Sequence, residues 1–149
     1  MHVSTIEARR RWMGVLAKAA PDEIAAAWSR IAPAPDYDLL RRPETGLVMV
    51  RGRIGGDGAP FNLGEMTVTR CSVRLADGVV GHAWVAGRRQ DHAERAAVLD
   101  ALMQAPAHRP AVEPEIVRLE SLQAARRDGA ARAAAATRVD FFTMVRGED

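Results

Sequence analysis

The sequence predicts an α+β domain, in which an antiparallel sheet of three to four strands packs with N-terminal, middle and C-terminal helices. Apolar residues recur with helical period at both ends of the chain and alternate with strand period in the middle. The turns between the predicted strands are too short for the crossovers that parallel pairing requires. At 149 residues, 48% of them hydrophobic, the chain suits a single domain spanning residues 1–149.

Two helices are predicted within residues 1–32. The apolar residues of the first recur at helical spacing: Ile6, Met13, Leu16 and Ala20. Pro21 begins the second, because proline is favoured in a first helical turn. The apolar residues of this helix are Ile24, Trp28 and Ile31. The proline-rich residues 32–38 then stop the helix and form a connector.

A β-meander is predicted over residues 46–86. "GLVMVRGRI" alternates, "FNLGEMTVTRCSVRL" is rich in β-branched residues, and "VVGHAWVAG" follows an "ADG" turn. In the second strand the apolar positions change parity, from Met66 and Val68 to Cys71 and Val73. One face cannot hold both sets, so we expect a bulge or sharp bend near Thr69–Arg70.

The helical period returns after Gly87. Asp91 and Glu94 suggest a capping box at the start of a helix over residues 91–104. An alanine-rich helix is expected over residues 114–136, with only part of its length buried. Residues 137–146 favour a fourth strand by composition, with helix as the alternative.

The glycine-rich stretch "GRIGGDGA" raises the question of a phosphate-binding loop. A Walker-type loop needs Gly-Lys-Ser/Thr before a helix, and a dinucleotide fingerprint also leads into a helix. Here a strand follows, so we interpret the stretch as a hairpin connection whose glycines supply positive φ angles. A backbone anion nest is the alternative.

Polar residues on the strands are the candidate anion- or partner-binding site. Arg51 and Arg53 project together, Arg70 lies beside the expected bulge, and Glu65 shares its strand parity with two hydroxyl residues, Thr67 and Thr69. Guanidinium groups and hydroxyls of this kind bind oxyanions, with Glu65 orienting an arginine. The alternative is a solvated or partner-facing sheet surface, which is common in antiparallel sheets.

Two histidines complete the candidate residues. His82 and His92 fit a metal site or acid–base chemistry in principle, but no cysteine or carboxylate cluster accompanies them. The alternatives are a packed His82 beside Trp84 and a His92 in the first turn of its helix. We therefore predict no metal site, and we recognise no set of catalytic residues.

Charge and composition exclude several classes of function. A formal net charge of +2, with acidic residues among the arginines, argues against a nucleic-acid-binding protein. Cys71 is the single cysteine, which excludes an intrachain disulfide. The N-terminus lacks the apolar core of a signal peptide, and no apolar run reaches the roughly 20 residues that span a bilayer. We expect a cytoplasmic protein without a membrane partner.

Several motifs, in order, resemble the PhnG family of the bacterial carbon–phosphorus lyase system. They extend from about Ala8 to Glu148 and read "RPETGLVMVRGRIGG", "FNLGEMTVTRCSVRL", "GHAWVAGR", "DHAERAAVLDALMQ" and "TRVDFFTMVRGE". The resemblance implies a subunit that is not catalytic alone and that assembles with PhnH-, PhnI- and PhnJ-type subunits and a PhnL-type ATPase.

The resemblance also implies the chemistry of that assembly. A phosphonate displaces adenine from ATP, which gives ribose 1-phosphonate 5-triphosphate. ATP and phosphonate are then substrates of the complex, and this chain alone binds no cofactor. A purely architectural scaffold without substrate contact is the alternative. A chain that needs partners exposes apolar surface when isolated, so we expect it to form a homo-oligomer by itself.

Overall fold

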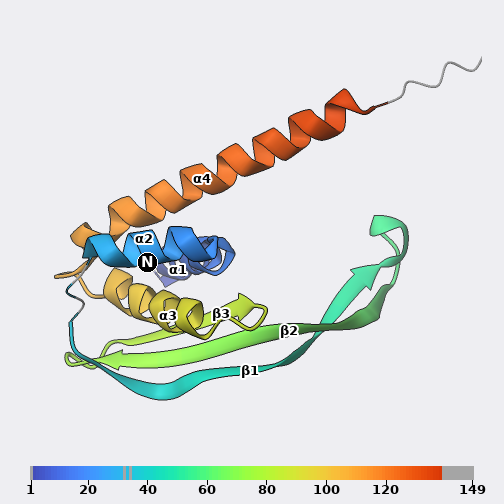
Figure 1. Cartoon of the computed structure of the whole chain (residues 1–149). Coiled ribbons are helices and arrows are strands. Elements are labelled where there is room, and N and C mark those ends of the chain that lie inside the picture. Colours follow the sequence, from blue (N-terminus) through green and yellow to red (C-terminus); the bar gives the residue numbers. More distant parts are fainter. Residues whose placement is uncertain (1, 32, 34, 139–149) are drawn as a thin grey trace, which may run out of the picture.

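The structure is a computed structural model, and it describes residues 2–31, 33 and 35–138. These residues form four α-helices and a three-stranded antiparallel sheet with strand order β1-β2-β3, which confirms the predicted α+β class. Figure 1 shows α3 (Gln90–Gln104) against one face of the sheet, with α1 (His2–Lys18) and α2 (Pro21–Ile31) stacked on α3. The fourth helix, α4 (Arg109–Ala136), runs across the outside of this stack.

The two N-terminal helices bury the sides that face α3. The buried side chains of α2 include Ile24, with Trp28 and Ile31 partly buried against the same core, as the sequence predicts. In α1 the buried side is instead centred on Trp12, Val15 and Leu16, and the next buried residue, Ala19, directly follows the helix. Ile6 is 68% exposed, so the predicted apolar stripe of this helix is wrong at its first position.

The first strand is longer than predicted. β1 spans Tyr37–Arg53 and pairs with β2 (Pro60–Leu75), which in turn pairs with β3 (Val80–Ala86). β1 begins within the connector expected over residues 32–38 and also includes residues 39–45, because Tyr37 and Leu39 lie opposite Leu75 and Val73. Its proline is accommodated at a register irregularity between Arg41 and Glu44.

The bulge predicted near Thr69–Arg70 is wrong. Opposite this part of β2 the extra residues lie on β1, between Leu39 and Glu44, and a separate register shift leaves Leu63 as an extra residue of β2. β2 pairs with β3 without interruption from Val68 to Arg74. The change of apolar parity in β2 has another cause: the strand uses both faces. Odd residues such as Cys71 and Val73 are buried in the core, and Met66 and Val68 point to the opposite face.

Helix α3 lies in the centre of the core. Gly81 of β3 lets it approach closely, since a Cβ there would stand 2.0 Å from the carbonyl oxygen of Ala97. The predicted capping box at its start is wrong. Arg89 is the N-cap and makes no side-chain capping bond, and the Glu94 carboxylate instead accepts a hydrogen bond from the Tyr37 hydroxyl at 2.8 Å.

Helix α4 begins five residues earlier than predicted, at Arg109, with a proline in its first turn and Pro114 inside it. Its buried residues end at Gln123, which confirms that only part of its length packs on the core. A strand was predicted over residues 137–146, but residues 139–146 of it lie outside the described residues.

A buried carboxylate connects α1, α3 and β3. Asp100 is 0% exposed, and its side chain accepts hydrogen bonds from Trp12 Nε1 and Arg9 Nη2 of α1, both at 2.8 Å. It also accepts the backbone N–H of His82 at 2.9 Å. Donors from two neighbouring elements therefore neutralise a charge that burial alone would strongly disfavour.

We expect Asp100→Asn to lower the free energy of unfolding by about 2–4 kcal/mol, because the amide removes the charge and turns an NH₂ group toward existing donors. Urea denaturation monitored by circular dichroism measures this change. Asp128→Asn on the exposed half of α4 is the matched control and should be neutral. Equal stability of the two variants would contradict the structural role of Asp100.

Candidate functional site: the hairpin arm and the outer face of the sheet

The β1–β2 hairpin extends beyond the rest of the sheet. Residues 47–53 pair with residues 60–67, whereas β3 pairs only with Val68–Arg74. Figure 1 shows this two-stranded segment, which we call the arm, projecting away from the helices. At its tip Gly55 and Gly56 have φ angles of 65° and 90°. The glycine-rich stretch is therefore a hairpin connection, as predicted, and no helix follows it.

The arm exposes large apolar side chains. The exposed fractions are 64% for Leu47, 54% for Met49, 67% for Ile54 and 66% for Leu63. A ribbon of two strands is marginally stable in water by itself, and exposed apolar surface of this kind is typical of contact sites. The arm is therefore suited to contact with another polypeptide.

A charged cluster lies at the base of the arm, on the sheet face that α3 does not cover. The carboxylate of Glu44 accepts hydrogen bonds from both Arg41 and Arg70. The Arg70 guanidinium also lies 5.4 Å from the ring centroid of Trp84, which is 50% exposed. Glu44, Arg70 and Trp84 border a recess of about 310 Å³. Hydrogen bonds from Arg41 and Arg70 lower the pKa of Glu44 below its usual value.

The predicted oxyanion site is not assembled. Arg51 lies opposite Asn62, eight residues along β2 from Arg70, so the two arginines are roughly 26 Å apart along the strand. Arg53 donates a hydrogen bond to the Gly58 carbonyl within its own loop. Glu65, exposed on the arm opposite Met49, forms no ion pair within the described part of the chain. Strand parity could not give the distance between these residues along the strand.

Thr67 and Thr69 have different environments despite their shared parity. Thr67 is half-buried, whereas Thr69 is 0% exposed. The Thr69 hydroxyl donates to the Gly87 carbonyl at 2.6 Å, accepts the Arg89 N–H at 3.0 Å, and lies 3.1 Å from the Thr45 hydroxyl. One donated and two accepted bonds use its full capacity. Thr69 therefore fixes the turn before α3 and has no bond left for an anion.

The two histidines lie on opposite sides of the sheet. His82 is exposed and hydrogen-bonded through Nδ1 to the Ser72 hydroxyl at 2.8 Å, so its interpretation as a packed residue is wrong. His92 is buried in the first turn of α3, and its Nε2 lies 2.8 Å from the Leu16 carbonyl. Within the described residues, no group of three or more His, Cys, Asp or Glu side chains is placed to hold a metal ion.

Two features of this surface were not predicted. Glu44 and Trp84 were not identified as partners of Arg70, although Trp84 shares the strand parity of His82 and so was placed on the same face. The ion pair between Arg70 and Glu44 depends on how β1 and β2 are aligned. The irregularities in β1 shift this alignment, so it could not be worked out from the sequence pattern.

No helix among the described residues is long and apolar enough to cross a membrane.

Comparison with known proteins identifies a family. Residues 7–147 match the family described as "Phosphonate metabolism protein PhnG". The chain is also 52% identical over 145 residues to a protein of Rhizobium meliloti (strain 1021), named alpha-D-ribose 1-methylphosphonate 5-triphosphate synthase subunit PhnG. That alignment covers 95% of this chain and 90% of the relative. The resemblance seen in the motifs is confirmed.

We expect the pKa of Glu44, measured by carboxyl ¹³C NMR, to lie below the usual glutamate value and to rise in Arg70→Gln, because one of its two guanidinium donors is lost. A pKa lowered by folding adds stability above the unfolded-state pKa, and that stability disappears as the pH falls through the native pKa. Arg74→Gln, which removes the partner of Asp38 instead, is the control and should leave Glu44 unchanged. An unchanged pKa in Arg70→Gln would refute the pairing.

We expect Thr69→Val to lower the free energy of unfolding by about 1–2 kcal/mol, because the partly buried Gly87 carbonyl and Arg89 N–H lose their partner. Thr67→Val is the matched control, because it replaces a hydroxyl by a methyl group on the same strand. It should alter the free energy of unfolding by no more than about 0.5 kcal/mol. Chemical denaturation of the two variants compares these values. Similar losses in both would show that the hydroxyl of Thr69 has no special role.

Proposed function

Because the chain belongs to the PhnG family of phosphonate metabolism proteins, we propose that it acts as a non-autonomous subunit of an α-D-ribose 1-methylphosphonate 5-triphosphate synthase. In this reaction a phosphonate replaces adenine at C1′ of the ribose of ATP, so the complex handles a triphosphate and a phosphonate together. The name of the relative with 52% identity supports the assignment. ATP and phosphonate are substrates of the assembly, which we place in the cytoplasm.

The observation that carries the subunit role is the arm. It consists of two strands with exposed leucines, and the described part of the chain provides no layer that covers it. A third strand or a helix from another polypeptide would bury this surface. We propose that PhnH-, PhnI- and PhnJ-type subunits and a PhnL-type ATPase supply the partner surfaces. Without them, the same surface favours self-association of the chain.

The charged residues support a positioning role and not a catalytic one. Among the described residues the Ser72 hydroxyl lies 2.8 Å from His82 Nδ1, but this exposed pair has no carboxylate that orients the histidine ring. Displacement at C1′ develops positive charge on the sugar, which arginine does not stabilise, while the phosphate groups must be held still. We therefore place the bond-breaking step on a partner subunit and assign this chain to binding and orientation.

We expect Leu47→Ser combined with Leu63→Ser to abolish co-purification with the co-expressed partner subunits, because both exposed leucines of the arm become polar. Native mass spectrometry of the purified material measures the assembly. The control is Leu122→Ser, which changes a leucine 41% exposed on α4. Normal assembly of the arm variant would overturn the role of the arm, and a wild-type chain that never co-purifies would overturn the subunit role.

A further inference from the structure

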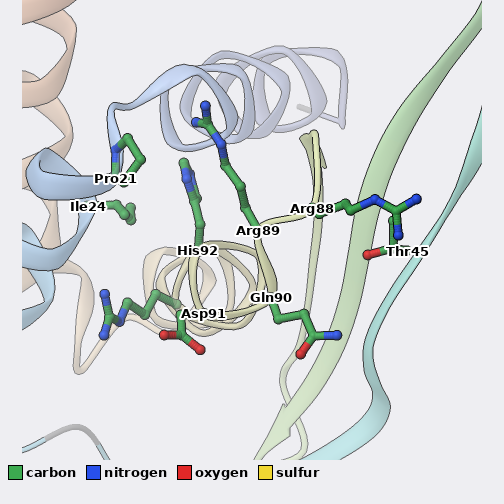
Figure 2. A pocket seen from close by; sticks show the side chains of 9 residues that line it. Pro21, Ile24, Thr45, Arg88, Arg89, Gln90, Asp91 and His92 are labelled. Atoms are coloured by element: carbon green, nitrogen blue, oxygen red, sulfur yellow. The ribbon is translucent and has the colours of Figure 1, made fainter.

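A second candidate site lies on the helical side of the sheet, away from the surface described above. It is a cleft of about 510 Å³ at the N-terminal end of α3, within the size range of small-molecule sites. Figure 2 shows side chains from the start of α2, the turn before α3 and the first turn of α3 around it. The lining residues that matter here are Arg88, Arg89, Gln90, Asp91, His92 and Arg95.

The cleft collects unpaired positive charge. Nine arginines of the described residues form ion pairs, but Arg88, Arg89 and Arg95 are not among them. Their guanidinium groups have no hydrogen-bond partner within the described ranges either. The lining contains three guanidinium groups and one carboxylate, that of Asp91; Arg89 lies beside His92, whereas Arg88 extends toward Thr45 (Figure 2). An anionic ligand would complete this balance.

The start of α3 adds backbone donors. The first hydrogen bond of the helix runs from the Ala93 N–H to the Arg89 carbonyl at 3.0 Å. The N–H groups of Gln90, Asp91 and His92 therefore have no carbonyl partner within the helix. Such groups, together with the helix dipole, favour anions. The turn that leads to them is held by Thr69 and by a left-handed Gly87 with a φ of 85°. The donors are therefore fixed before any ligand arrives.

His92 supplies an independent sign of a ligand. Its side chain lines the cleft although the residue is only 4% exposed, and its buried Nδ1 atom has no hydrogen-bond partner among the described residues. Because Nε2 donates to the Leu16 carbonyl, Nδ1 of the neutral ring is a lone-pair acceptor. Figure 2 shows the ring directed along the cleft beside Arg89 and toward Pro21. A buried acceptor of this kind is costly unless something donates to it.

We propose that this cleft binds a tetrahedral oxyanion that carries a proton, namely a phosphate or phosphonate group. The unpaired arginines and the free N–H groups of α3 hold the charged oxygens. The P–O–H group donates to Nδ1 of His92. This inference goes beyond the subunit role, because it assigns a ligand site that is built within the chain itself and does not involve the arm.

The requirement for a proton separates phosphate from sulfate. Both are tetrahedral anions, but at neutral pH sulfate has no O–H to donate. Isothermal titration of the full chain with inorganic phosphate, methylphosphonate and sulfate at fixed ionic strength tests this difference. We expect phosphate and methylphosphonate to bind at least about tenfold more tightly than sulfate, because sulfate leaves the buried Nδ1 acceptor without a donor.

Matched variants locate the site. Arg89→Gln combined with Arg95→Gln should weaken phosphate binding by at least about tenfold. Arg51→Gln combined with Arg53→Gln removes the same charge from the arm and should change affinity by less than about twofold. His92→Gln retains a donor toward Leu16 and removes the Nδ1 acceptor, so it should abolish the preference for phosphate over sulfate. Circular dichroism confirms that each variant is folded.

Three results would overturn the proposal: equal affinity for sulfate and phosphate, equal losses in the cleft and arm variants, or no binding to either the isolated chain or the purified assembly. If the wild type binds no anion and the cleft variant no longer joins its partners, the cleft receives a partner carboxylate. The proposal then fails while the subunit role stands. Conversely, site-specific phosphate binding without any assembly would retain the site and remove the subunit role.

Discussion

The architecture depends on the buried carboxylate of Asp100. Because it accepts bonds from α1 and from the backbone of β3 while belonging to α3, it fixes three elements relative to one another. Its bond to the His82 N–H holds β3 against α3, and the close approach at Gly81 allows that distance. With α3 so placed, its N-terminus lies beside α2, and Trp84 lies on the opposite face of the sheet.

The strand β2 supports both candidate sites, the cleft at the start of α3 and the outer face of the sheet. Its inward residue Thr69 anchors the turn that carries Arg88 and Arg89, and its outward neighbour Arg70 joins Glu44 and Trp84. Alternation along a strand therefore places an anion-suited cleft on one side and a partner-suited face on the other.

Hydrophobic period was enough to predict the class of fold, the order of the elements and the hairpin nature of the glycine-rich stretch. Periodicity did not predict the first part of β1. This strand extends through Pro43, against its local composition, because residues of β2 are available to pair with it. The site was harder, because Arg51 and Arg70 share a strand ladder without sharing a location. Two of the cleft arginines, Arg88 and Arg89, follow Gly87 directly, but only the tertiary structure shows that neither has an acidic partner among the described residues.

Helix α4 continues for residues 124–136 after its last buried side chain. A helix rises about 1.5 Å and turns about 100° per residue, so this segment spans roughly 20 Å as a stiff spacer. Its many alanines meet that requirement as well as any other good helix formers would. The length of such a segment therefore matters more than its composition. Inserting a single residue would rotate the end of the helix by more than a quarter turn, whereas exchanging one helix former for another would leave its direction unchanged.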